Sequence, residues 1–133
     1  MARRGEVGFT LVEVVITVAI LAILASMLVP NVTGVVPKGK ENAYNGDRRL
    51  LQGVITVYYS AAQAYPTYSG QTGAPSATLN SYIDMDALLA RKILVDRPRS
   101  ANSFNGGTGS YGWYVDDQGR VESIPPFIPG VYP

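Results

Sequence analysis

The side chain with the clearest chemical potential is Glu13, because it is an acid inside an apolar stretch. Almost every residue from Phe9 to Val29 is apolar, and the nearest basic residues, Arg3 and Arg4, lie before that stretch. An ionised carboxylate in hydrocarbon is costly unless a positive group compensates it, so an acid there is a candidate functional group by default. The chemistry that Glu13 points to is pairing with a positive charge.

The stretch around Glu13 has the length and composition of a membrane span. At a rise of about 1.5 Å per residue, residues 9–30 would cover about 30 Å, the thickness of a bilayer core. Arg3 and Arg4 precede the span and nothing equally basic follows at once, which places the amino terminus in the cytoplasm. A cleavable secretory signal is the alternative, but its apolar core is normally only about 7 to 15 residues long. We therefore expect a single-pass protein of the cytoplasmic membrane.

Residues 1–30 resemble the N-terminal signature of type IV pilins and the related pseudopilins. The resemblance rests on a short basic leader, the Gly8-Phe9 junction, the string Thr10-Leu11-Val12-Glu13, the apolar helix and Pro30. It implies that a prepilin peptidase cuts between Gly8 and Phe9 and that the new amino terminus of Phe9 is methylated. It also implies that Glu13 pairs with the terminal amine of Phe9 on an adjacent subunit. The alternative role for Glu13 is a tolerated acid near the membrane edge.

Length and composition limit what the rest of the chain can do. Of 133 residues, roughly a hundred follow the leader and span, which is enough for one small domain. The sequence has no Cys and no His, which removes thiol nucleophiles, Cys-ligated metals and the commonest general base. No Ser, Lys or pair of acids stands in a recognisable catalytic context, so we expect no enzyme and no cofactor. The net charge of +1 does not indicate nucleic-acid binding.

Residues 31–39 are expected to form a kinked or unwound linker. Pro30 and Pro37 each lack an amide donor, and Gly34 adds backbone freedom. In the resembled family, Pro30 lies where the long helix bends or melts during assembly, whereas Gly34 and Pro37 depart from the family pattern. The predicted division is a cleaved leader at 1–8, a transmembrane assembly helix at 9–30, the linker, and a small extracytoplasmic head at 40–133.

The head is expected to begin with an amphipathic helix over residues 40–65. Its apolar residues recur at spacings of one, three and four: Leu50, Leu51, Val54, Ile55, Tyr58, Tyr59 and Ala62. A second, short helix is expected over residues 84–92, with an acidic cap and a basic end. Residues 93–95 are interpreted as a short strand.

A β-hairpin is expected near the end of the chain, with strands at 111–115 and 120–124. Alternation places Tyr111, Trp113 and Val115 on one face, which we expect to pack on the helical stripe. Asp116 and Asp117 lie in the turn, but calcium needs six to eight oxygen ligands, so no metal site is expected. The predicted fold class is α+β: a long N-terminal helix packed on a small antiparallel sheet, as in pilins.

The sequence as a whole predicts a structural subunit of a type IV pilus or a pilus-like filament. It would be stored in the inner membrane as a prepilin, cleaved after Gly8, and polymerised through its apolar helix into a homo-oligomeric filament outside the cytoplasm. The expected partners are a prepilin peptidase/methyltransferase and the pilus assembly machinery. One alternative is a pseudopilin of a type II secretion system. The other is a membrane-anchored binding domain that never polymerises, retains residues 1–8 and tolerates Glu13→Ala.

Overall fold

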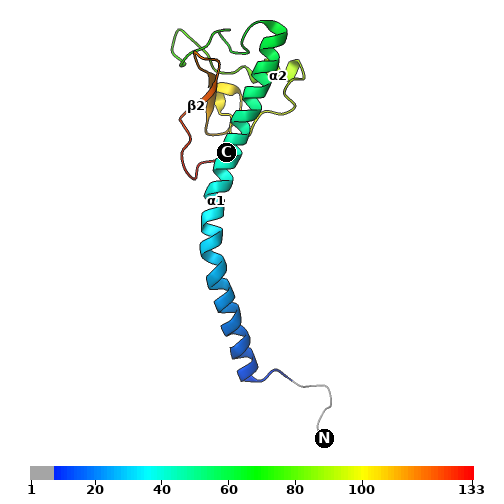
Figure 1. Cartoon of the computed structure of the whole chain (residues 1–133), viewed down its shortest axis with the longest axis vertical. Helices are drawn as coiled ribbons and strands as arrows, with labels where there is room; N and C mark the ends of the chain where they lie inside the picture. The colour runs from blue at the N-terminus through cyan, green and yellow to red at the C-terminus, as the bar shows by residue number, and fades with distance from the viewer. Residues whose placement is uncertain (1–7) are drawn as a thin grey trace. The chain divides into compact units, whose positions relative to one another are not determined.

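The computed structural model describes residues 8–133, and between 29 and 36 it describes the backbone but not the side chains. The chain divides into two units, Met1–Val36 and Pro37–Pro133, which are described separately. The predicted leader lies outside the described residues except for Gly8. The elements, shown in Figure 1, are α1 (Leu11–Ala62), α2 (Met85–Ala90), the 3-10 helix η1 (Ser103–Asn105), β1 (Gly112–Val115) and β2 (Val121–Ile124). This composition confirms the pilin-like α+β class.

Helix α1 passes through residues 31–39 without interruption. The expectation of an unwound linker there is therefore wrong for this structure. Each proline removes one amide donor from the helix, and inside a long helix this bends the axis more readily than it ends the helix. The boundary between the two units does fall inside the predicted linker. A kink at Pro30, Gly34 or Pro37 stays a prediction.

The core of the head forms where the second half of α1 packs against β1. Leu51, Val54 and Ile55 are buried, in agreement with the predicted stripe. Leu50 and Tyr59, assigned to the same stripe, are 48% and 41% exposed. Each residue turns a helix by about 100°, so Leu50 points away from the core although its neighbour Leu51 is buried.

The predicted hairpin is confirmed. Strands β1 and β2 pair antiparallel in a register that runs from Gly112↔Ile124 to Val115↔Val121. Tyr111, Trp113 and Val115 are fully buried, so the alternating face does point into the core. Residues 81–83 line the other edge of β1, where the Ile83 amide donates to the Trp113 carbonyl at 3.0 Å. The sequence did not predict that residues 81–83 pair with β1, because a segment of three residues is too short to show the alternation of a strand.

The short helix α2 is confirmed, whereas the strand expected at residues 93–95 is wrong. The Asp84 side chain caps α2 by accepting from the Ala87 amide at 3.3 Å, and Leu88 is fully buried. The amides of Ile93 and Leu94 both donate to the Leu88 carbonyl, at 3.1 and 3.3 Å. Those donors close the end of the helix and are not available to a sheet.

A partly buried hydrogen-bond chain ties the carboxyl-terminal tail to α1. The Trp113 indole Nε1 donates to Ser100 Oγ at 3.0 Å, and Ser100 Oγ donates to Asp47 Oδ2 at 2.6 Å. The Tyr132 hydroxyl donates to the same Asp47 oxygen at 2.8 Å. Burial, the hydrogen bond and the Asp47 charge raise the pKa of Tyr132 to about 12, so the phenol stays protonated at neutral pH. The tail thus packs along the head.

The hairpin turn is organised by Asp116, which is only 9% exposed. Its Oδ1 accepts from the amides of Gln118 and Arg120 at 2.9 and 2.8 Å, and its Oδ2 accepts from Arg120 Nε at 3.0 Å. Burial acts to raise the pKa of Asp116, but the bonds from Arg120 and Gln118 outweigh it and hold the pKa below 3.8. The Asp116 carboxylate is thus held by hydrogen bonds within its own turn.

Replacing Asp116 with alanine is expected to destabilise the head by about 1.5 to 3 kcal/mol, the usual effect of losing hydrogen bonds to a charged group. Because the folded pKa is lowered, this contribution is complete above the ordinary carboxyl pKa and is lost as the pH falls through the folded value. Urea unfolding of the full chain in detergent at pH 7 and pH 3 would measure both effects. Asp117→Ala is the matched control, because Asp117 is exposed and its loss should change stability by less than about 0.5 kcal/mol. An equal decrease in the free energy of unfolding for Asp116→Ala and Asp117→Ala would contradict the role of Asp116 in stabilising the turn.

Candidate assembly site on helix α1

Glu13 and Thr10 form a reciprocal cap at the start of α1. The Thr10 amide donates to Glu13 Oε2 at 2.9 Å, and the Glu13 amide donates to Thr10 Oγ1 at 3.2 Å. Both amides belong to the first turn of the helix, where backbone donors have no partner within the helix. This arrangement is a capping box, and its sequence pattern is Thr-x-x-Glu before an apolar run. Our reading of the sequence noted the acid and missed the cap.

The helix cap partly offsets the negative charge of the Glu13 carboxylate within one chain. Its oxygen accepts from an amide, and it lies at the positive end of the α1 dipole. Among the described residues, the salt bridges are Arg48–Glu122, Arg97–Asp86 and Arg120–Asp116, so Glu13 is in none of them. The carboxylate is therefore held in a defined place at the helix start and still lacks a cationic partner among the described residues.

Phe9 and Gly8 lie beside this cap. The Phe9 side chain is 86% exposed, next to an apolar hollow of about 190 Å³ that it forms with Val14, Thr17 and Val18. A Cβ added at Gly8 would meet no atom within 4 Å. The described fold thus gives no packing reason for glycine at this position.

The apolar surface that follows the cap has no cover in the described chain. The stretch Leu11–Leu28 is long and apolar enough to cross a membrane, and 0% of it is buried. Large apolar side chains are exposed throughout it, including Leu11 at 81% and Leu28 at 62%. Such a surface requires an apolar environment from outside the chain, either lipid or protein.

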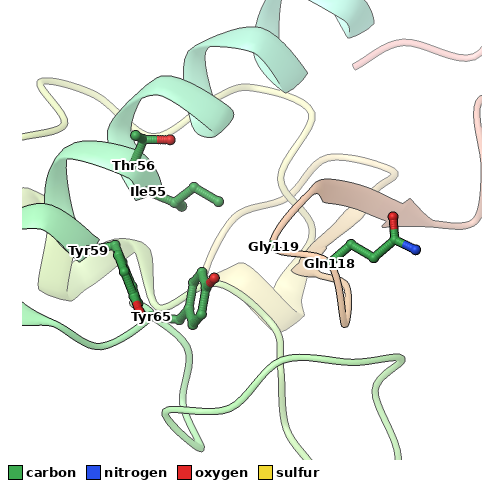
Figure 2. Close-up of a pocket in the computed structure, with 6 residues that line it drawn as sticks. All are labelled: Ile55, Thr56, Tyr59, Tyr65, Gln118 and Gly119. Carbon is green, nitrogen blue, oxygen red and sulfur yellow. The ribbon is translucent and has the colours of Figure 1, made fainter.

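A hollow in the head is the other candidate site, and it lies between the end of α1 and the hairpin turn. Figure 2 shows Tyr59 and Tyr65 beside one another, with Gln118 and Gly119 across from them. The hollow has a volume of about 200 Å³, and the ring centroids of Tyr59 and Tyr65 are 4.7 Å apart. Gly119 has a φ of +78°, and a Cβ there would lie 2.9 Å from the Tyr65 hydroxyl, so the turn requires glycine.

The lining of this hollow offers phenol, hydroxyl and amide groups and contains no carboxylate or amine. Within residues 8–133, no group of three or more acidic, His or Cys side chains is placed to hold a metal ion. The hollow is therefore explained by packing of the turn against α1. The arrangement with distinctive chemistry is the capped acid beside Phe9 and the uncovered apolar helix.

Comparisons with known proteins found a matching motif and similar proteins. Residues 3–29 match the family model for the prokaryotic N-terminal methylation motif. The chain is 37% identical over 100 residues to the type II secretion system core protein G of Aeromonas hydrophila, covering 75% of this chain and 61% of that protein. It is 36% identical over 67 residues to the protein of the same name from Pseudomonas aeruginosa, covering 50% of this chain and 47% of the relative.

The protein of the same name from Vibrio cholerae is 39% identical over 64 residues, covering 48% of this chain and 44% of the relative. The chain thus spans about half to three fifths of these relatives. No solved structure matches it significantly. The chain thus carries the prokaryotic N-terminal methylation motif, and over part of its length it is similar to type II secretion system core proteins G.

Proposed function

We propose that this chain is a structural subunit of a pilus-like filament, and that the filament is a pseudopilus of a type II secretion system. The observation that carries the proposal is the uncovered apolar stretch Leu11–Leu28, which contains the capped acid Glu13 near its start. The core protein G relatives favour the pseudopilus over a surface pilus. The proposed role is structural, with no reaction catalysed.

The driving force for assembly would be an exchange of one apolar environment for another. Before assembly, lipid covers Leu11–Leu28, and the chain sits in the cytoplasmic membrane with its amino terminus inside. In the filament, the apolar helices of neighbouring subunits cover it. Because the two contacting surfaces of a subunit differ, the contact repeats without closing and yields a fibre.

Glu13 would make this assembly specific. A prepilin peptidase/methyltransferase would cut between Gly8 and Phe9 and methylate the new terminus, which creates a positive amine one helical turn from Glu13. Within one chain, the Thr10 amide already occupies Glu13 Oε2. The terminal amine of a neighbouring subunit would then add the cation that the described chain lacks. In a site shielded from water, such a pair is stronger than at a surface.

The proposal is tested in the source cells by deletion of the gene and by its overexpression. Deletion should abolish export of type II substrates while leaving surface pili unchanged, and overexpression should produce fibres visible by electron microscopy after shearing. Loss of surface pili with normal export would instead identify a type IV pilus subunit. An export defect without fibres under any expression level would favour the membrane-anchored binding domain.

A further inference from the structure

The carboxyl-terminal tail, residues 125–133, lies on the head without extending its sheet. Strand β2 ends at Ile124, and no residue of the tail, all of which is described, is part of a helix or strand. From β2 the tail returns to α1 (Figure 1). The described residues give the tail one backbone-to-backbone hydrogen bond, from the Val131 amide to the Ile128 carbonyl, and it lies within the tail itself. The tail is therefore held by side chains, as a bound peptide is.

Three side chains of the head donate hydrogen bonds to main-chain oxygens of the tail. The bonds run from Lys40 Nζ to Gly130 at 2.8 Å, from Tyr111 Oη to Val131 at 2.7 Å, and from Ser110 Oγ to Pro133 at 2.7 Å. Every residue has a main-chain oxygen, so these donors recognise the path of an extended segment rather than one exact sequence.

Two side chains of the tail add contacts of their own. The Phe127 ring lies against two aromatic rings, with its centroid 5.0 Å from that of Tyr44 and 6.5 Å from that of Tyr111. The Tyr132 hydroxyl donates to Asp47. The surface that receives the tail, called the tail groove, thus combines aromatic rings with polar side chains: Lys40, Tyr44, Asp47, Ser110 and Tyr111.

The tail groove suits a proline-rich segment. Three of its polar groups donate to main-chain oxygens, and it receives the Ile128 amide at Tyr111 Oη, at 3.1 Å. A proline offers an oxygen and has no amide hydrogen that must find a partner, so it matches a groove of donors. Proline also keeps a segment extended before it binds, and aromatic-lined grooves commonly bind such segments. The tail itself has four prolines: Pro125, Pro126, Pro129 and Pro133.

We propose that the tail groove is a peptide-binding site for an extended, proline-rich segment of another protein, and that the chain's own tail occupies it as an intramolecular competitor. The segment is defined by main-chain oxygens placed as those of Gly130, Val131 and Pro133 are, with an aromatic side chain before them in the place of Phe127. The site is independent of the proposed filament function, because it uses contacts of the head alone.

The chain's own tail competes strongly because it is covalently attached. A short attached segment acts at an effective concentration on the order of millimolar, so a free peptide binds the unmodified chain weakly. Phe127→Ala together with Tyr132→Phe removes the two side-chain contacts of the tail and leaves the groove residues unchanged. This released variant should bind a free peptide at least about tenfold more tightly than the unmodified chain does.

The experiment titrates the full chain in detergent against labelled peptides and follows fluorescence anisotropy. The first peptide has the sequence of residues 125–133. The second carries Ile128→Gln and Val131→Leu, and its affinity for the released variant should be within about threefold of the first. The third replaces the four prolines with alanine and should bind about tenfold more weakly, because a more flexible segment loses more entropy on binding.

Two variants of α1 test whether the peptide binds in the tail groove. In the released variant, Lys40→Ala removes the donor to the Gly130 oxygen and should weaken binding of the first peptide about fivefold. Arg49→Ala is the matched control, since it also removes a cation from α1 but lies about 180° around the helix from Lys40. Its affinity for the peptide should be unchanged.

The combined results decide the proposal. Tight binding of the first two peptides to the released variant, weakened by Lys40→Ala and not by Arg49→Ala, would support it. A folded released variant that binds no peptide would overturn it, as would binding of the first peptide without the second, which reserves the groove for the chain's own tail. Equal binding of the proline-free peptide would also overturn it.

Two further measurements complete the test. A dimer of the unmodified chain that the first peptide dissociates would assign the tail groove to a second copy, and would overturn the proposal. Circular dichroism establishes whether the released variant is folded. If it is not, Tyr132→Phe alone takes its place, with the same order of affinities expected for the three peptides.

Discussion

Replacing Glu13 with alanine is expected to abolish filaments while the protein remains in the membrane. The substitution leaves the apolar stretch Leu11–Leu28 intact, so membrane insertion should not change. It removes the carboxylate that would pair with a neighbouring amine, and loss of a buried interfacial charge costs about 2 to 5 kcal/mol, or roughly 30-fold to several thousand-fold in affinity. Filament yield after shearing and the amount of protein in the membrane fraction measure the two effects.

Two matched variants separate the charge of Glu13 from its role in the helix cap. Glutamine at position 13 can still accept from the Thr10 amide, as glutamine does in a capping box, but carries no charge. Thr10→Ala removes the hydroxyl that accepts from the Glu13 amide and retains the charge, at a cost of about 1 kcal/mol to the helix end. We expect Glu13→Gln to lose filaments and Thr10→Ala to keep most of them. The reverse pattern would show that the cap, and not the charge, governs assembly.

Replacing Trp113 with alanine is expected to unfold the head at moderate temperature. The side chain is fully buried, its ring centroid lies 5.0 Å from that of Tyr44, and its indole nitrogen donates to Ser100. Removing a buried tryptophan costs about 3 to 5 kcal/mol, a large fraction of the stability of a small domain. At about 4 to 8 °C per kcal/mol, the midpoint should fall by at least about 12 °C. Far-ultraviolet circular dichroism of the full chain measures the midpoint.

Trp113→Phe serves as the comparison for this experiment. Phenylalanine keeps an aromatic ring in the core but does not donate to Ser100 Oγ, which still donates to Asp47. The midpoint should fall less than in Trp113→Ala, since one hydrogen bond and part of the volume are lost. An unchanged midpoint in Trp113→Ala would contradict the placement of Trp113 in the core.

The parts of the fold that sequence predicted are those with strong local signals. The hairpin has alternating residues around a glycine-containing turn, and α2 has Asp84 as its cap. The span is apolar apart from Glu13, Thr17 and Ser26. In the hairpin and in α2 the local pattern and the tertiary environment agree, which is why the pattern was sufficient.

The parts that sequence did not predict depend on partners distant in the chain. Nothing local to Asp47 indicates that Ser100 and Tyr132 both donate to it. The exposure of Leu50 depends on which face of α1 meets β1. The helical state of residues 31–39 reflects the helix on both sides, which outweighs the weak local preference of Gly34. The capping box at Thr10 and Glu13, by contrast, has the local pattern Thr-x-x-Glu and was predictable from the sequence. The prediction for Glu13 rested on its charge alone.

The most direct test of the assembly mechanism is the intact mass of the protein recovered from sheared filaments. A mass that begins at Phe9 and carries one added methyl group is the predicted result, because the proposed cleavage after Gly8 would create the amine that is proposed to pair with Glu13. A functional form that retains residues 1–8, in cells that produce no fibres, would contradict the account.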